Sequence, residues 1–315
     1  MFVSASSPDT WVVRTDGCLA SDSGCVDARG RTFNPNSSTT WTQDGYYQLG
    51  VDQNLGLSIQ GVFGNDTVGL GLQGSGGPVL QKQIVAAYRS QDLYLGMFGL
   101  NPAPTNFSAT DQGRPSYMAS LKEQNLIPSL SFGYTAGNQY SLKQVYGSLT
   151  LGGYDSSLFT SNPLSIPFAA DPARNLMVAI QSIVSEDQNG TSDALLSSPI
   201  MANVDSTVSV IYLPLHACQA FEKAFGLVWD QKTQLYLVDD NLHSALQTQN
   251  ATVTFTLGET TSGGNTTKIT LPYNSFDLTV KPPAFGVSSS QKYFPLRRAA
   301  NDTQYTLGRT FLQEA

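Results

Sequence analysis

The sequence predicts a mainly β protein made of two lobes, with a few short helices. The first observation is a series of short runs rich in β-branched and aromatic residues, separated by Gly, Asn, Asp or Ser, which is typical of strands joined by turns. The second is that helical periodicity is rare, and the third is that the two halves of the chain share one pattern. The expected strands cover residues 62–72, 81–89, 93–100, 146–154, 176–184, 250–258 and 267–276.

Three segments have features of helices. Residues 114–127 and 239–247 repeat apolar side chains at helical spacing. Residues 213–226 place Pro214 at the start and Gly226 at the end, which are the positions that these two residues favour in helices. The sequence therefore predicts two short helices and a third, shorter one.

The two halves pair similar elements. Residues 2–13 and 202–214 each hold an apolar strand that runs into a loop of small hydroxyl residues. A strand of two larger residues followed by glycine comes about 95–105 residues later in each half, at 97–99 and at 306–308. This repeat predicts an N-terminal lobe, 1–148, and a C-terminal lobe, 149–315, with the junction around residues 140–155.

The charge of the chain excludes one class of function. Only 13% of the 315 residues are charged, and the net charge is −7. Nucleic acid binding requires clustered Lys and Arg, and Arg297-Arg298 is the only basic pair in the sequence. No apolar run approaches the roughly 20 residues that span a bilayer. We expect a monomer without a membrane span in this segment and without nucleic acid as a partner.

No cofactor or metal is expected. Gly69–Gly74 fits the G-x-G-x-x-G pattern of dinucleotide sites, but Gly76-Gly77-Pro78 follows in place of a helix. The acidic pairs Asp239-Asp240 and Glu186-Asp187 lack the further ligands of a metal site and are expected in solvated turns.

The three cysteines have two expected roles. Cys18 and Cys25 lie seven positions apart in a polar stretch and predict a small disulfide-closed loop, worth roughly 2–3 kcal/mol. Cys218 shares helical spacing with Phe221 and Phe225, so a buried, unpaired thiol is favoured over a nucleophile.

N-glycosylation sequons are dense. A disulfide together with seven N-x-S/T motifs favours a secreted or cell-wall-facing glycoprotein whose leader lies outside this chain. The sequons begin at Asn36, Asn65, Asn106, Asn189, Asn250, Asn265 and Asn301.

One carboxylate lies in an unusual place. Asp205 interrupts an apolar run, Met201 to Pro214, that is rich in β-branched residues. An unpaired buried carboxylate costs several kcal/mol unless it has a partner or keeps its proton. The sequence therefore predicts a functional or inherited reason for Asp205.

Several stretches resemble the pepsin family of aspartic proteases, in its fungal form. Together they extend over nearly the whole chain, and Trp11 matches the tryptophan that follows the family's first catalytic loop. The resemblance implies two β-barrel-like lobes around a long cleft, and a preference for extended peptides. The stretches are FGNDTVGLG, LYLGMFGLNP, PSYMASLKEQNLIPSLSFGY, GSLTLGGYDSSLF, VDSTVSVIYLP and YTLGRTFLQEA.

The family's chemistry needs one aspartate in each lobe, within a D-[TS]-G-[TS] loop. The two carboxylates share one proton, so one acts as base on a bound water and the other as acid on the substrate carbonyl. Alignment from Trp11 places Ser4 where the first aspartate belongs. In the second loop Asp205 and Ser206 match, but Thr207 replaces the glycine. The resemblance thus implies a site that retains one catalytic aspartate, Asp205.

The alternatives for this site are weaker. Asp9 lies five positions after Ser4, where the family often has a non-catalytic aspartate. A nucleophilic Ser4 would need a base, and the histidines, His216 and His243, have no evident triad partner. The family's flap tyrosine is replaced by Leu57 in one alignment, while Tyr46 or Tyr47 takes that place in another. Residues expected to line the cleft are Ala5, Ser6, Ser7, Trp11, Leu57, Ser206, Thr207 and Tyr212.

The leading hypothesis is a non-catalytic aspartic protease homologue whose cleft binds an extended peptide or protein ligand. The first alternative is an active acid endopeptidase with an atypical site built on Asp205. The second is an interaction or inhibitor module on the same fold. Loss of one of two cooperating catalytic groups typically costs about 10⁴-fold or more in rate, which favours the non-catalytic hypothesis.

Overall fold

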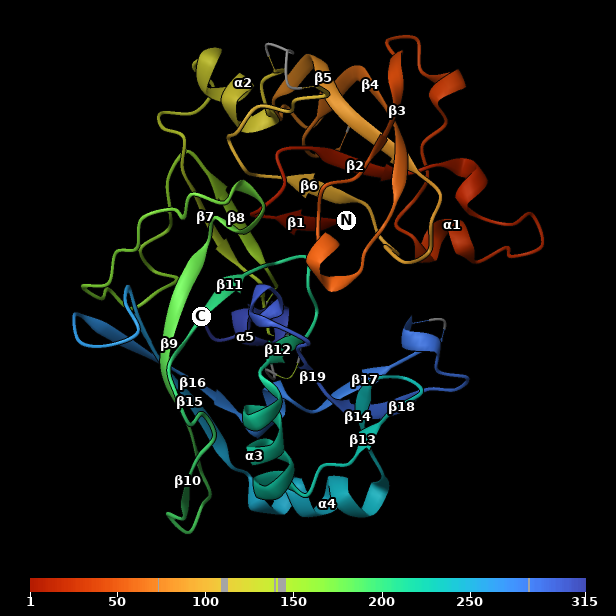
Figure 1. The fold of residues 1–315 in the computed structure, drawn as a ribbon. Coiled ribbons are helices and arrows are strands. Elements are labelled where there is room, and N and C mark those ends of the chain that lie inside the picture. Colours follow the sequence, from red (N-terminus) through yellow and green to blue (C-terminus); the bar gives the residue numbers. More distant parts are fainter. Residues whose placement is uncertain (73, 109–112, 139, 141–145, 283) are drawn as a thin grey trace. The chain divides into compact units, whose positions relative to one another are not determined.

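A computed structural model gives the structure of residues 1–315 apart from 73, 109–112, 139, 141–145 and 283. The chain divides into two compact units (Figure 1). Unit 1 comprises Met1–Gly133 and Leu149–Asp155, and unit 2 comprises Tyr134–Ser148 and Ser156–Ala315. The lobe boundary predicted at residues 148/149 remains a prediction, and part of the expected junction, 141–145, lies outside the described residues.

Unit 1 is built on one six-stranded sheet with the strand order β1-β6-β2-β5-β4-β3. The long β4 and β5 pair in antiparallel fashion, whereas β1 runs parallel to β6 and β2 runs parallel to β5. The strands are β1 (Phe2–Ser4), β2 (Thr10–Val13), β3 (Thr42–Gln48), β4 (Gln60–Gly69), β5 (Val79–Tyr88) and β6 (Met97–Gly99), and the helices are α1 (Cys25–Ala28) and α2 (Tyr117–Glu123).

The core of unit 1 contains two apolar clusters. Trp11 of β2 is fully buried and lies in one cluster with Phe63, Tyr88 and Met97. A second cluster gathers Leu121 of α2 with neighbouring apolar side chains. Helix α2 begins after Ser116, whose Oγ accepts a hydrogen bond from the Ala119 N–H, so the helix has the N-cap that such a short element needs.

Unit 2 contains an eight-stranded and a four-stranded sheet. The larger has the order β16-β15-β9-β11-β20-β12-β19 with β10 added to β9, and the smaller has the order β13-β14-β18-β17. The strands are β9 (Met177–Glu186), β10 (Ser192–Ala194), β11 (Ile200–Val204), β12 (Ile211–Leu213), β13 (Trp229–Asp230), β14 (Leu235–Val238), β15 (Thr252–Gly258), β16 (Thr266–Pro272), β17 (Leu278–Val280), β18 (Gln291–Phe294), β19 (Leu296–Arg298) and β20 (Thr306–Leu307). A separate two-stranded sheet contains β7 (Phe132–Thr135) and β8 (Ser148–Leu151).

The helices of unit 2 follow from their apolar spacing and end residues. Helix α3 (Leu215–Phe225) buries Cys218, Phe221 and Phe225 on one face, and Gly226 ends it with a φ of 65°. An L side chain is strained in that left-handed conformation, which explains the glycine. The two other helices are α4 (Asp240–Gln249) and α5 (Arg309–Leu312).

The predicted mainly β fold with a few short helices is confirmed, and each of the three expected helices is present. Several strands are shorter than predicted, and only Ser148–Leu151 of the run 146–154 is strand. Strand β16 ends at Pro272, because Tyr273–Ser275 turns into a 3-10 helix, and only Met97–Gly99 of the run 93–100 is strand. Among the described residues, no helix is both long and apolar enough to cross a membrane.

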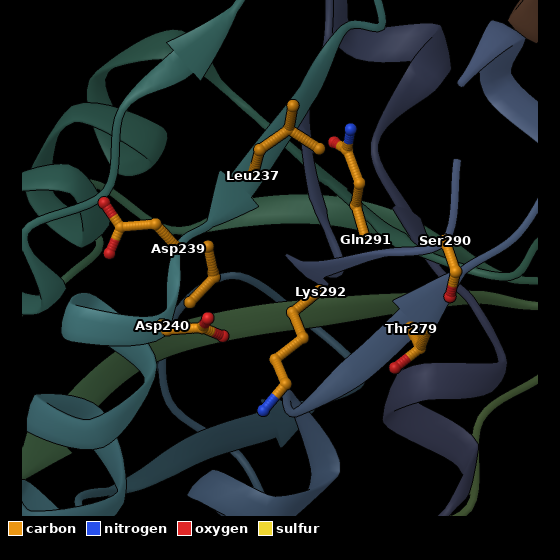
Figure 2. A pocket seen from close by; sticks show the side chains of 8 residues that line it. Leu237, Asp239, Asp240, Thr279, Ser290, Gln291 and Lys292 are labelled. Atoms are coloured by element: carbon orange, nitrogen blue, oxygen red, sulfur yellow. The ribbon is translucent and has the colours of Figure 1, made fainter. Parts of the chain in front are cut away.

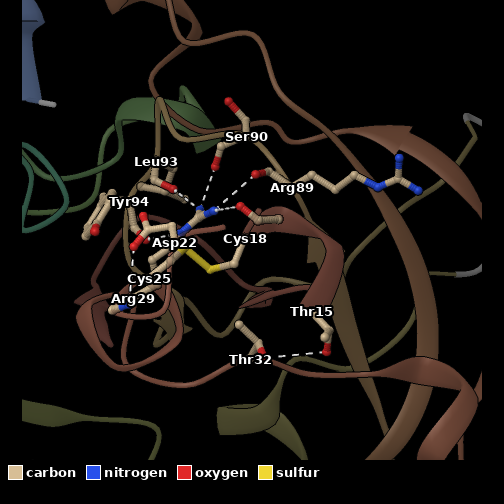
Figure 3. The surroundings of a disulfide bond; sticks show 12 residues. Thr15, Cys18, Asp22, Cys25, Arg29, Thr32, Arg89, Ser90, Leu93 and Tyr94 are labelled. Carbon is tan, nitrogen blue, oxygen red and sulfur yellow. Dashed lines mark hydrogen bonds between the residues drawn. A yellow bond between two sulfur atoms is a disulfide. The ribbon is translucent and has the colours of Figure 1, made fainter. Parts of the chain in front are cut away.

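A buried cation, Arg29, lies beside the disulfide loop of unit 1 (Figure 3). Cys18 and Cys25 are bonded, as predicted, with their Cα atoms 5.7 Å apart. The Arg29 side chain lies next to this loop and is 1% exposed. Its guanidinium donates five hydrogen bonds to main-chain carbonyls, and therefore has each of its N–H directions occupied by uncharged acceptors. These carbonyls belong to Gly17, Arg89, Ser90, Leu93 and Tyr94.

Candidate active site

The loops after β1 and after β11 have the same local framework in the two units. Strand β1 runs parallel to β6 and pairs Ser4 with Gly99. Strand β11 runs parallel to β20 and pairs Val204 with Leu307, which brings the next residue, Asp205, level with Gly308. In each unit, the strand that follows the loop also pairs in antiparallel fashion with the same partner. This is β2 with β6 in unit 1 and β12 with β20 in unit 2.

The glycines show that the two loops correspond residue by residue. A Cβ atom on Gly99 would lie 2.7 Å from the carbonyl oxygen of Ser7 and 2.5 Å from that of Asp9. These are the third and fifth residues after Ser4. A Cβ atom on Gly308 would lie 2.5 Å and 2.3 Å from the carbonyl oxygens of the third and fifth residues after Asp205. Ser4 therefore occupies in unit 1 the place that Asp205 occupies in unit 2.

Ser4 is an entirely buried hydroxyl residue. Its Oγ accepts a hydrogen bond from the Ser7 N–H at 3.0 Å and lies 3.4 Å from the Ser6 Oγ. The loop is also held by the segment that follows β6, because Asn101 donates from Nδ2 to the Ser6 carbonyl at 3.0 Å. A serine hydroxyl in this setting can donate or accept hydrogen bonds. It does not ionise as a carboxyl group does, so it cannot share an acidic proton with a neighbouring carboxylate.

Asp205 is 3% exposed and is held by its own loop. Its Oδ1 accepts hydrogen bonds from the Thr207 N–H at 2.8 Å and from the Thr207 Oγ1 at 2.5 Å. Arg309, directly after Gly308, donates from Nη1 to the carbonyls of Ser206 and Thr207 at 3.1 and 2.8 Å. These donors hold the Asp205 carboxylate in one orientation within its loop, and its role in catalysis remains a prediction.

Asp9 is a partly buried acid at the end of the Ser4 loop. Burial raises the pKa of its carboxyl to about 6, although the hydrogen bond from the Thr105 hydroxyl lowers it. An unfolded chain would have this carboxyl at its ordinary pKa of 3.8. Asp9 therefore binds a proton more tightly in the folded state, and its contribution to stability is complete below pH 3.8 and is lost as the pH rises through 6.

We expect the Asp9→Asn variant to show this effect directly. The free energy of unfolding of the native chain, minus that of the variant, should fall by up to about 3 kcal/mol between pH 3.5 and pH 7. Urea denaturation at several pH values measures the difference. The matched control is Asp193→Asn, at an exposed position on β10. A difference that stays constant or rises with pH would contradict the assignment.

The other expected cleft residues lie as follows. Trp11 is buried in the core of unit 1, and Leu57 packs on the same cluster from the segment that joins β3 to β4. Tyr47 of β3 is partly buried against that cluster, whereas Tyr46 is 68% exposed. In unit 2, the Tyr212 hydroxyl accepts a hydrogen bond from Arg297 at 2.9 Å. The role of these residues in a cleft remains a prediction, as does the role of Ala5.

The remaining candidates have structural surroundings. His216 is exposed at the start of α3. The His243 Nε2 lies 2.8 Å from the Asp277 Oδ2, and its Nδ1 lies 2.6 Å from the Lys292 Nζ, so its partners belong to neither loop. Cys218 is buried without a disulfide, and burial raises the pKa of its thiol to about 12, which makes it a poor nucleophile.

Six of the seven sequon asparagines are exposed. Asn65 differs because it lies within β4, is only partly exposed, and donates from Nδ2 to Asp44 at 3.1 Å. The acidic residues outside the loops also have local roles. Asp239 caps α4, and Asp187 accepts the N–H groups of its own turn. Among the residues with described positions, no cluster of three His, Cys, Asp or Glu side chains is arranged to hold a metal ion.

The comparisons with known proteins identify the family. The model of the family described as "Eukaryotic aspartyl protease" matches residues 2–315, so the chain belongs to the eukaryotic aspartyl protease family. The resemblance to pepsin-like proteases of fungi is thereby confirmed. The family match covers both loops, Ser4 as well as Asp205.

Its curated relatives include fungal proteases. Candidapepsin of Candida tropicalis is 26% identical over 320 residues, covering 99% of this chain and 70% of that protein. Secreted aspartic protease 8 of Candida albicans is 25% identical over 251 residues, covering 77% and 56%. Rhizopuspepsin-5 of Rhizopus niveus is 27% identical over 201 residues, covering 62% and 46%. The matched region thus spans from about half to 70% of the length of these relatives.

A solved structure supports the same fold. The aspartic proteinase from Irpex lacteus superposes with a TM-score of 0.60 at 20% identity, covering 99% of this chain and 84% of that one. At this identity the likeness shows the fold alone.

Proposed function

We propose that this chain is a non-catalytic member of the aspartyl protease family that binds an extended peptide. The observation that carries the proposal is Ser4, which has the place in its loop that Asp205 has in the corresponding loop. The chemistry of pepsin-like proteases needs two carboxylates that share a proton. A serine hydroxyl does not ionise near neutral or acidic pH, so it cannot replace the second carboxylate.

The packing around both loops supports a retained binding role. Ser4 and Asp205 are each buried and hydrogen-bonded within their loops, and Asn101 and Arg309 brace those loops from neighbouring segments. Extended peptides bind such proteins largely through main-chain hydrogen bonds, which do not depend on the missing carboxylate. The loss of catalysis therefore leaves the binding of a peptide in place.

The cellular setting follows from the relatives. Because one of them is named a secreted aspartic protease, we propose that this chain is also secreted. The Cys18–Cys25 disulfide is consistent with an oxidising compartment, and the exposed sequons would then be available for glycosylation. We propose that it acts there as a monomer.

The first alternative is an acid endopeptidase built on Asp205 alone. The burial of Asp205 and its two hydrogen bonds from Thr207 favour it, because they keep a carboxylate in an ordered position. The second alternative, an inhibitor or interaction module, would use the exterior of the fold and would not need either loop.

An acid digestion assay tests the proposal. We expect the native chain to cleave a denatured protein at pH 3 no faster than its Asp205→Ala variant, and pepstatin to have no effect on that rate. Cleavage that is abolished both by pepstatin and by Asp205→Ala would instead establish the endopeptidase. Calorimetric titration with pepstatin separates the remaining functions, since binding without cleavage supports a peptide site and no binding supports the inhibitor module.

Restoring the second carboxylate gives the converse result. The variant that combines Ser4→Asp, Ala5→Thr, Ser6→Gly and Thr207→Gly should gain pepstatin-sensitive cleavage, because cooperating catalytic groups typically contribute about 10⁴-fold or more together. The control adds Asp205→Ala to this variant and should be inactive. Circular dichroism confirms that each variant is folded.

A further inference from the structure

A polar cavity of about 620 Å³ lies beside the Asp205 loop, and all the residues that line it belong to unit 2. Ser209, four residues after Asp205, forms part of its wall, as do Arg309 and Thr310 at the start of α5. On another side the wall comes from Asp277 and from the β17 segment that follows it. The cavity therefore begins where the loop of the retained aspartate ends.

Two cations line this cavity. Lys281 is exposed after β17 and forms no ion pair with any residue of the described part of the chain, and Arg309 contributes the second positive charge. The one carboxylate in the wall, Asp277, lies 2.8 Å from the His243 Nε2, and the Lys292 Nζ lies 2.6 Å from Nδ1 and 3.0 Å from Nε2 of the same ring. Asp277 therefore has His243 and Lys292 close to it, while Lys281 and Arg309 give the lining more positive than negative charge.

Arg309 is held in position before any ligand arrives. Its Nη1 donates to the carbonyls of Ser206 and Thr207, which are uncharged acceptors. A side chain fixed in this way loses little rotamer freedom when it binds a ligand, so less of the interaction energy is spent on ordering it.

One further acid lies near the wall. Glu314 accepts hydrogen bonds from Asn138 and from Tyr140, which is itself a lining residue. Burial raises the pKa of the Glu314 carboxyl above its ordinary 4.5, so that in a mildly acidic medium it carries less negative charge. This change lowers its repulsion of an anionic ligand.

A neighbouring cavity of about 520 Å³ has the opposite balance (Figure 2). Asp239 and Asp240 lie along one wall, with Lys292 as the one cation in the lining. Thr279 lines both cavities. The contrast identifies the cavity beside the Asp205 loop as the more favourable of the two for an anionic group.

We propose that the cavity lined by Lys281 and Arg309 binds an acidic side chain, Asp or Glu, of the extended peptide. This inference rests on the proposed function, because it assigns a specificity to the same peptide-binding role. Both cations can donate hydrogen bonds to a carboxylate, and the hydroxyl groups of Ser209 and Thr279 line the same cavity. Replacement of the acid by its amide removes the charge and keeps the shape.

Two matched sets of fluorescein-labelled octapeptides test this inference. In a background of Ser, Val, Thr and Ala, one set carries a single Glu at each successive position, and the other set carries Gln at the same positions. Fluorescence polarisation at pH 5 should show that Glu is favoured over Gln by about tenfold at one or two adjacent positions only. Lys281→Gln should reduce that preference to about threefold or less, and Lys281→Arg should retain it.

The control removes one charge elsewhere in unit 2. Lys268→Gln, at an exposed position on β16, should leave the preference unchanged. Equal binding of the Glu and Gln peptides at every position would overturn the acidic specificity and leave the peptide-binding function standing. A preference that Lys268→Gln reduces as much as Lys281→Gln does would also overturn it. If neither set binds, the proposed function fails together with this inference.

Discussion

The Arg29→Lys variant will lose at least about 3 kcal/mol of the unfolding free energy of unit 1. A lysine retains the charge but donates at most three hydrogen bonds, from one atom, where the guanidinium donates five in a plane. A carbonyl left without a donor costs about 1–3 kcal/mol where water cannot replace that donor. The bond to Leu93 is buried, and the other four are partly buried. The stacking of Arg29 over Tyr88 and Tyr94, at 5.8 and 5.5 Å from the ring centres, is lost as well.

Tryptophan fluorescence can isolate this effect. Of the three tryptophans, Trp11 and Trp41 belong to unit 1, so urea denaturation in a Trp229→Phe background reports on unit 1 alone. The matched control is Arg31→Lys, two positions away, whose side chain is 82% exposed. Equal midpoints for the Arg29→Lys and Arg31→Lys variants would mean that the buried guanidinium is not required.

The second large effect concerns the glycines that face the two loops. Gly99→Ala and Gly308→Ala should each cost about 3 kcal/mol or more, because the new methyl group would lie 2.3–2.8 Å from main-chain atoms. Overpacking of a core typically costs about 1–3 kcal/mol when side chains can move aside, and main-chain carbonyls in a strand-bounded loop have less freedom. Thermal or urea denaturation of each variant measures the loss.

Gly50→Ala is the control for this pair, since a Cβ atom there would have no heavy atom within 4 Å. It should change the stability by less than about 1 kcal/mol. A mild effect of Gly99→Ala together with a severe effect of Gly308→Ala would show that the Ser4 loop is more loosely packed than the Asp205 loop.

The elements with regular spacing were predictable from the sequence. Helix α3 combines a periodic apolar face with Pro214 and Gly226 at its ends, and the structure begins and ends it within that segment. Strand β16 was predicted too long, because the apolar run continues through Tyr273 although the main chain turns there. Periodicity records which side chains are buried, but it does not record where the chain changes direction.

The candidate site was predictable only in part. Asp205 could be singled out because it interrupts an apolar run, and Ser4 because the family resemblance aligns it, through Trp11, with the first catalytic aspartate. The role of Arg29 could not be predicted, because its partners are main-chain carbonyls up to 65 residues away. Every residue has a main-chain carbonyl, so the sequence does not indicate which ones accept. The same holds for Arg309, whose carbonyl acceptors lie 102 and 103 residues earlier in the chain.

Gly99 and Gly308 lie close to their loops, and this contact lets the requirements of packing be distinguished from the requirements of catalysis. The glycines are required by the space between strands, whatever reaction the loops support. The Ser4 position holds a buried hydroxyl where the corresponding loop holds a carboxylate, although the glycine facing it is the same. The packing of the fold can therefore be retained when a catalytic residue is replaced, and a match to the family shows the shared packing rather than the shared reaction.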